Sequence, residues 1–154
     1  MVALLITPKS DKKVVEAVKA ACKKAGVNAE AVIPQFSMNK DNDQVADVEQ
    51  CLSSTPSHRY DGVFVFANAA DYTEGKDLGC ALRFIGQAFK HCKTIGANDQ
   101  GSDLVAQATM KMHLKSPGVV MGKKDGAAMA KEFLSQLAEH RHWEREEPAA
   151  ALPY

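Results

Sequence analysis

The chain has 154 residues, a length typical of a single domain. With 45% hydrophobic and 25% charged residues, its composition is that of an ordinary globular protein. Nineteen basic residues balance nineteen acidic ones, so no overall field attracts nucleic acid or an anionic membrane surface. The longest nearly apolar run, residues 62–70, is far shorter than the about 20 residues that span a bilayer, and the first residues lack the charged region of a signal peptide. We therefore expect a soluble protein and favour the cytoplasm.

The first half of the chain predicts strands and one helix. The continuous apolar run at its start is typical of a strand that is buried on both faces of a parallel sheet. A strand that begins at residue 2 also suggests a domain cut from a longer protein. The expected elements are a strand over residues 2–7, a helix from Ser10 or Asp11 to about Gly26, a strand over residues 28–33, a polar excursion over residues 36–50 with a small hairpin that ends at Val48, and a central strand over residues 63–66.

The second half continues the alternation. Its expected elements are a helix over residues 74–91, a strand over residues 94–97, a short helix from Ser102, a strand over residues 118–121 and a helix from about Asp125 to Trp143. Such alternation predicts an α/β fold with a doubly wound, mostly parallel sheet, and right-handed crossovers place helices on both faces in a three-layer αβα arrangement. We assign residues 1–145 to this domain. Residues 146–154 form an irregular tail that either extends freely or lies along a partner.

The long helix predicted over residues 74–91 is apolar on more than one side. Cys80, Phe84 and Ala88 lie opposite its main apolar stripe, so we expect the helix to be covered twice, by its own sheet and by a second element. Two interpretations stand equally: a well-buried helix, or a docking face for another domain or subunit. We add His142 and Trp143 to this candidate interface.

The cysteines and histidines do not have the spacing of a metal site. We favour free thiols over a disulfide framework for the four cysteines, which are Cys22, Cys51, Cys80 and Cys92. Residues two apart on a helix point to different sides, so His140 and His142 make a poor shared metal site. We expect both to lie at a basic helix end, where they interact with the helix dipole.

The turn between Lys93 and Gly101 has the build of a catalytic elbow. A strand that passes through such a turn into a helix can project one side chain into the crevice at the carboxyl end of a parallel sheet. The tip residue here is Asp99, and neither Cys nor Ser stands at the tip. Asp99 with Gln100 and Asp103 could hold a cation or act as a base, but we favour a polar, solvated turn.

A phosphate-binding loop is not indicated at this turn. The glycines at 96 and 101 have a suitable spacing, but Ser102 and Asp103 stand where Lys and Ser or Thr are required. The first strand is not followed by a Gly-x-Gly-x-x-Gly fingerprint either. We therefore assign no catalytic, cofactor-binding or metal-binding residue.

The opening strand and the elbow resemble the DJ-1/PfpI branch of the class I glutamine-amidotransferase-like fold. Enzymes of that branch carry an elbow of the form Ala-Ile-Cys-His-Gly, onto which residues 97–101 fall. Asp99 then takes the place of the cysteine and Gln100 that of the histidine. An ungapped alignment puts Val14 where those enzymes keep a carboxylate that hydrogen-bonds the thiol. The resemblance therefore implies the fold without its thiol chemistry.

A closer resemblance is to the C-terminal domain of large-subunit haem catalases, and it covers nearly the whole chain. Residues 10–21 are similar to its first helix, residues 61–66 to its central strand and residues 88–93 to the end of its long helix. The most specific stretch is the His-Arg-His-Trp-Glu-Arg segment within residues 136–146. A departure lies at residues 68–79, where we expect a more Gly-rich turn.

This resemblance implies a flavodoxin-like appendage on a tetrameric haem catalase, an enzyme that disproportionates hydrogen peroxide. The haem and its ligands belong to a preceding β-barrel domain, and we place none of Tyr60, Tyr72 and Tyr154 at a haem site. The implied roles are to stabilise the homotetramer with the catalase core, to shape peroxide access, or to offer a chaperone-like surface. Two alternatives remain: a stand-alone holdase that binds unfolded clients around Phe84 and Ala88, and a residual DJ-1-type enzyme that uses Asp99 or a cysteine.

Overall fold

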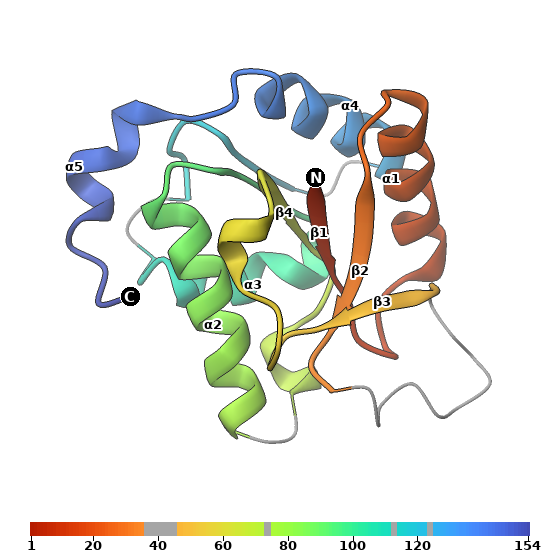
Figure 1. The fold of residues 1–154 in the computed structure, drawn as a ribbon, viewed down its shortest axis with the longest axis horizontal. Helices are drawn as coiled ribbons and strands as arrows, with labels where there is room; N and C mark the ends of the chain where they lie inside the picture. Colours follow the sequence, from red (N-terminus) through yellow and green to blue (C-terminus); the bar gives the residue numbers. More distant parts are fainter. Residues whose placement is uncertain (36–45, 73–74, 112–113, 123–124) are drawn as a thin grey trace.

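A six-stranded, entirely parallel sheet organises the computed structural model, which describes residues 1–35, 46–72, 75–111, 114–122 and 125–154 (Figure 1). The strands lie in the order β3-β2-β1-β4-β5-β6. Their bounds are Val2–Leu5 for β1, Ala29–Ile33 for β2, Val48–Cys51 for β3, Gly62–Val65 for β4, Thr94–Ala97 for β5 and Val119–Met121 for β6. The predicted α/β fold with a doubly wound sheet is confirmed.

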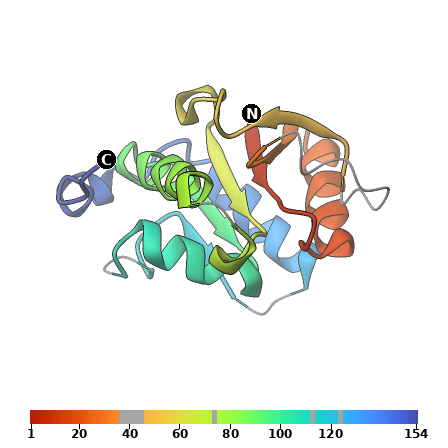
Figure 2. The same cartoon turned by 90° about the horizontal axis from the view of Figure 1, so that it is seen from below.

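Helices cover both faces of the sheet, which gives the predicted three layers (Figures 1 and 2). Helices α1 (Lys12–Lys24) and α4 (Gly126–Leu137) pack on one face, and α2 (Gly75–Lys90) and α3 (Asp99–Ala108) on the other. Successive residues of a strand point to opposite faces. Accordingly, β1 sends Leu4 into the core under α1 and α4 and Leu5 into the core under α2 and α3. Within the described residues, no helix combines the length and the apolar character that a membrane crossing demands.

The edge strand β3 was not predicted. Residues 36–45, the larger part of the expected excursion, lie outside the described residues. Residues 48–51 pair with β2 in parallel, with a register shift between Ala31 and Val32. At this shift the Glu49 carboxylate accepts the Ala31 N–H at 2.6 Å and pairs with the Lys19 ammonium at 2.7 Å. The side chain of Glu49 thus takes over a backbone hydrogen bond at the shift.

Two predicted helix boundaries need correction. Helix α3 begins at Asp99, three residues before the expected start, because the Asn98 side chain accepts the Gly101 N–H and acts as the N-cap. Helix α4 ends at Leu137 instead of Trp143. His140 adopts a left-handed φ of 66°, which an α-helix does not accommodate. A 3-10 turn, η4 (Trp143–Arg145), and the short helix α5 (Glu146–Ala149) follow.

The C-terminal tail, expected to extend freely or to lie along a partner, packs on α2 of its own chain instead. Ala149 and Leu152 are buried in the core, and the ring of Tyr154 lies directly over Gly86. The Lys90 ammonium donates to the carbonyl oxygens of Leu152 at 3.4 Å and Tyr154 at 2.5 Å. Helix α2 is apolar on more than one side, and the side that carries Gly86 is covered in part by this C-terminal segment of the same chain.

Candidate functional site

The elbow lies where β5 ends and α3 begins, at the carboxyl edge of the sheet. Asn98 fixes the turn twice: its side-chain oxygen accepts the Gly101 N–H at 2.9 Å, and its own N–H donates to the Val65 carbonyl at the end of β4. A Cβ on Gly101 would lie 2.1 Å from the Val65 carbonyl oxygen. The first turn of α3 therefore sits against the backbone of β4 as closely as only glycine permits.

The Gln100 side chain reaches from the start of α3 to the loop between β1 and α1. Its Oε1 accepts the Asp11 N–H at 3.3 Å, and its Nε2 donates to the Lys9 carbonyl at 3.5 Å. These bonds link the start of α3 to the loop between β1 and α1. The Gln100 side chain therefore has a structural role: it connects α3 to the loop that precedes α1.

Asp99 lies exposed in the first turn of α3, where a carboxylate is favourable to the helix dipole. Asp103 accepts from the Gln107 side chain at 2.8 Å, one turn further along the same helix. The described part of the chain contains no cluster of three or more His, Cys, Asp or Glu residues that could hold a metal ion. The geometry supports the polar, solvated turn that the sequence favoured.

The neighbouring polar groups at this edge serve the fold as well. Thr7 donates its hydroxyl proton to the Asp71 carboxylate at 3.3 Å, and Ser10 donates to the Phe66 carbonyl at 3.2 Å. Asn68 caps η3 (Ala69–Asp71) and forms a capping box with Asp71. The segment at 68–71, where a Gly-rich turn was expected, is therefore a capped 3-10 turn. Val14, aligned with the carboxylate of the thiol enzymes, packs toward α4 instead.

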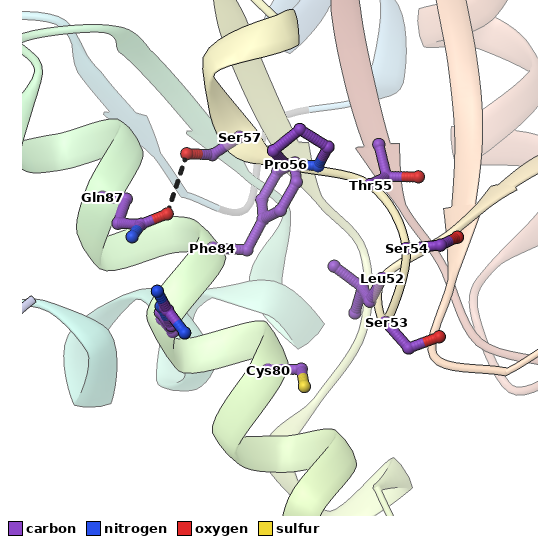
Figure 3. A pocket seen from close by; sticks show the side chains of 10 residues that line it. Leu52, Ser53, Ser54, Thr55, Pro56, Ser57, Cys80, Phe84 and Gln87 are labelled. Atoms are coloured by element: carbon purple, nitrogen blue, oxygen red, sulfur yellow. Dashed lines mark hydrogen bonds between the residues drawn. The ribbon is translucent and has the colours of Figure 1, made fainter.

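A second region is the pocket beside α2 that Figure 3 shows, with a volume of about 300 Å³. Cys80, Phe84 and Gln87 of α2 face the segment 52–57, and the Ser57 hydroxyl donates to Gln87 at 3.1 Å. Phe84 is only 4% exposed and packs against Tyr60 at a ring distance of 5.9 Å.

Of the two interpretations of α2, the burial of its second apolar side supports the well-buried helix. Phe84 and Ala88 are buried, since the segment 52–60 covers the side of α2 that the sequence left without a partner. Cys80 is half-buried at the rim of the pocket. The four cysteines are free thiols, as predicted.

His142 and Trp143, the remaining residues of the candidate interface, have opposite surroundings. His142 is 1% exposed: its N–H donates to the Cys92 carbonyl at 2.8 Å, and its Nε2 lies 3.0 Å from the Thr94 hydroxyl. Burial, and then the neighbouring Arg145, lower the pKa of the His142 imidazole. His142 thus fastens the end of the chain to β5, and the predicted role at a helix end is wrong. Trp143 is 65% exposed.

Arg145 is a buried residue that the sequence did not reveal. It is fully buried, donates from its guanidinium to the Lys93 carbonyl, and stacks over Phe89 at 4.5 Å. Burial lowers the pKa of Arg145 to about 10 and that of its buried neighbour Lys93 to about 8. Composition cannot distinguish a buried arginine from a solvated one. The only sequence signal for Arg145 is that it belongs to the specific segment 140–145.

Most of the chain matches a known protein family. Residues 1–147 match the model of the C-terminal domain found in long catalases. The chain is 30% identical to Catalase-2 of Bacillus subtilis over 86% of its own length and 19% of that protein. It is 27% identical to Catalase HPII of Pseudomonas aeruginosa over 99% of its own length and 21% of that protein. The chain thus spans about a fifth of the length of these curated relatives.

Among solved structures, the chain is similar to oxidized DJ-1 of Toxoplasma gondii. The TM-score is 0.67, the sequence identity is 12%, and the match covers 99% of this chain and 98% of that one. At this identity the similarity shows the shared fold.

Proposed function

Because the chain belongs to the family of C-terminal domains found in long catalases, we propose that it is the non-catalytic accessory domain of a haem catalase. In this role it stabilises the assembly and shapes the access of hydrogen peroxide to the catalytic core. Its partners are that core and the other subunits of a homotetramer. The family match over residues 1–147 carries the proposal. That the chain spans about a fifth of its catalase relatives supports placing peroxide chemistry in the other part of such a protein.

The state of the elbow argues against residual DJ-1-type chemistry. A nucleophilic cysteine works as a thiolate and needs an environment that lowers its pKa. At this elbow Asp99 is exposed and Gln100 bridges two backbone segments. Cys92, the nearest cysteine in the sequence, is buried, and burial raises the pKa of its thiol. The described residues at the elbow therefore do not provide the activated nucleophile that a DJ-1-type enzyme needs.

The surroundings of Tyr60 and Tyr72 do not fit a haem site. A tyrosine that ligates catalase haem does so through its phenol oxygen. The Tyr60 hydroxyl already donates to the Glu30 carboxylate at 2.9 Å, and burial raises the pKa of both Tyr60 and Tyr72. The pocket beside α2 is not lined by a tyrosine.

The holdase alternative loses the surface on which it rested. A holdase needs an accessible apolar patch, but Phe84 and Ala88 are buried under the chain's own segments. Met110 and Trp143 are the exposed large hydrophobic residues among those that the structure describes. Two scattered side chains of this kind are ordinary on a protein surface.

Haem titration of the purified chain tests the proposal. We expect no Soret band characteristic of bound haem and no peroxide decay above that of free haemin, because the proposal places the haem ligands in the catalytic core. A haem-loaded catalase at the same haem concentration serves as the positive control. Stoichiometric haem binding accompanied by peroxide turnover would refute the accessory role.

A further inference from the structure

A pocket of about 340 Å³ lies at the C-terminal end of α2. Helix α5 packs beside this end of α2 (Figure 1). The pocket is separate from the elbow and from the pocket of Figure 3. Lys90, Cys92 and Lys93 line it from the end of α2, and Arg141, Trp143 and Glu146 line it from the segment that leads into α5. Residues far apart in the sequence thus form one cavity of the size that small ligands occupy.

Positive charge predominates in this cavity. Three cationic side chains, Lys90, Lys93 and Arg141, line the pocket together with one carboxylate, that of Glu146. Outside the lining, the partly exposed Asp61 carboxylate lies 3.9 Å from the Arg141 guanidinium. The Lys90 ammonium is held by the carbonyl oxygens of Leu152 and Tyr154, so Lys93 and Arg141 are the cations left to receive a ligand. The C-terminus of α2 contributes a partial negative charge of only about half a unit. Basic side chains are not needed to cap the helix either, since the carbonyls of Ala88 and Phe89 already accept backbone N–H groups. Neither the helix dipole nor helix capping therefore explains why three cationic side chains gather at this end of α2.

Two of the neighbouring cations are buried with incomplete hydrogen bonding. Arg145, fully buried beside Cys92, has its Nε and Nη1 among the buried atoms without a hydrogen-bond partner. The Lys93 ammonium, with three N–H groups, is 3% exposed and donates to the Ser57 carbonyl at 2.8 Å. Burial of a cation without a matching anion is costly. In agreement, burial and then the nearby Arg141 lower the pKa of Lys93.

We propose that the pocket at the end of α2 binds a small organic anion through a phosphate or carboxylate group. Lys93 and Arg141 supply the charge that receives this group, and the buried guanidinium of Arg145 adds to the positive potential from behind Cys92. The exposed indole of Trp143 flanks the body of the ligand. This ligand site goes beyond the accessory role in a catalase and does not depend on it.

The chain carries its own reporter for this site, because Trp143 is its single tryptophan. We propose to titrate the chain with inorganic phosphate and with citrate at constant ionic strength, following Trp143 fluorescence and the thermal midpoint. We expect a saturable fluorescence change and a rising midpoint with at least one of the two anions. Saturation with phosphate alone assigns a phosphate ligand, and saturation with citrate alone assigns a polycarboxylate.

Charge-changing variants locate the binding. Arg141→Gln should raise the apparent dissociation constant about tenfold, since it removes a cation from the pocket wall. Glu146→Gln removes the carboxylate of the pocket and should tighten binding roughly twofold to fivefold. Glu147→Gln is the matched control, because it makes the same charge change at the next position, which does not line the pocket. Its affinity should equal that of the wild type.

Two results would overturn the proposal. One is the absence of a saturable response to either anion up to about 50 mM, well above the millimolar range of weak specific binding. The other is equal affinity of the wild type and the Glu146→Gln variant. The second comparison holds even where Arg141→Gln impairs folding, because the Glu146 side chain is exposed.

Discussion

At the scale of single residues, the elbow is shaped by packing at Gly101. A Cβ there would lie 2.1 Å from the Val65 carbonyl oxygen, so Gly101→Ala must push α3 away from β4. We expect a loss of roughly 2–4 kcal/mol of unfolding free energy, measured by urea denaturation. Gly79→Ala is the control, since Gly79 lies exposed on α2 with open space at its Cβ. That change should stabilise the protein by about 0.5–1 kcal/mol. Equal effects at both sites would contradict the described packing.

A second residue-scale prediction concerns the buried Lys93. Its folded pKa of about 8 lies below the ordinary 10.5, so the folded state holds the proton less tightly than the unfolded state. The cost of the buried charge is full below pH 8 and disappears as the pH rises through 10.5. The unfolding free energy of the wild type, measured relative to Lys93→Met, should therefore rise by up to about 3 kcal/mol over this window.

Denaturant titrations at several pH values measure this difference. Lys12→Met, at the exposed start of α1, corrects for the loss of one lysine. A difference between wild type and Lys93→Met that stays constant from pH 7 to 10.5 would mean that Lys93 is not desolvated as the structure indicates.

At the scale of elements, the C-terminal segment is part of the fold because it covers α2. Leu152 is buried in the core between helices, so Leu152→Ala should cost about 2–4 kcal/mol in unfolding free energy. Pro153→Ala, at the exposed neighbouring position, should change it by less than about 0.5 kcal/mol. Thermal and urea unfolding measure both. Equal, small effects of both substitutions would contradict the packing of the tail on α2.

Elements with strong local signals were predictable from the sequence. Apolar runs marked β1 and β4, and Asp11 marked the start of α1 through its capping side chain. The predictions of helix ends and of the tail were wrong where contacts between distant segments determine the local conformation. The left-handed conformation of His140 ends α4 without a glycine to announce it, and the tail is ordered by its contact with α2.

The candidate site was predictable only in part, for the same reason. The sequence placed Asp99 and Gln100 at an elbow without a thiol. It did not show that Gln100 reaches the backbone of Lys9 and Asp11, since these bonds join residues that are 91 and 89 positions apart in the sequence. The burial of Phe84 and Ala88 depends likewise on the distant segment 52–60. Helix periodicity identifies an apolar face but not what covers it.

At the scale of the whole molecule, the central claim is that this domain supports a catalase without taking part in its chemistry. The direct measurement compares the parent catalase with and without this domain, by peroxide turnover per haem and by the midpoint of thermal inactivation. We predict that turnover per haem in freshly prepared enzyme stays within about twofold, while the inactivation midpoint falls by roughly 5 °C. Loss of turnover per haem from a stable, haem-loaded tetramer that lacks the domain would contradict this account.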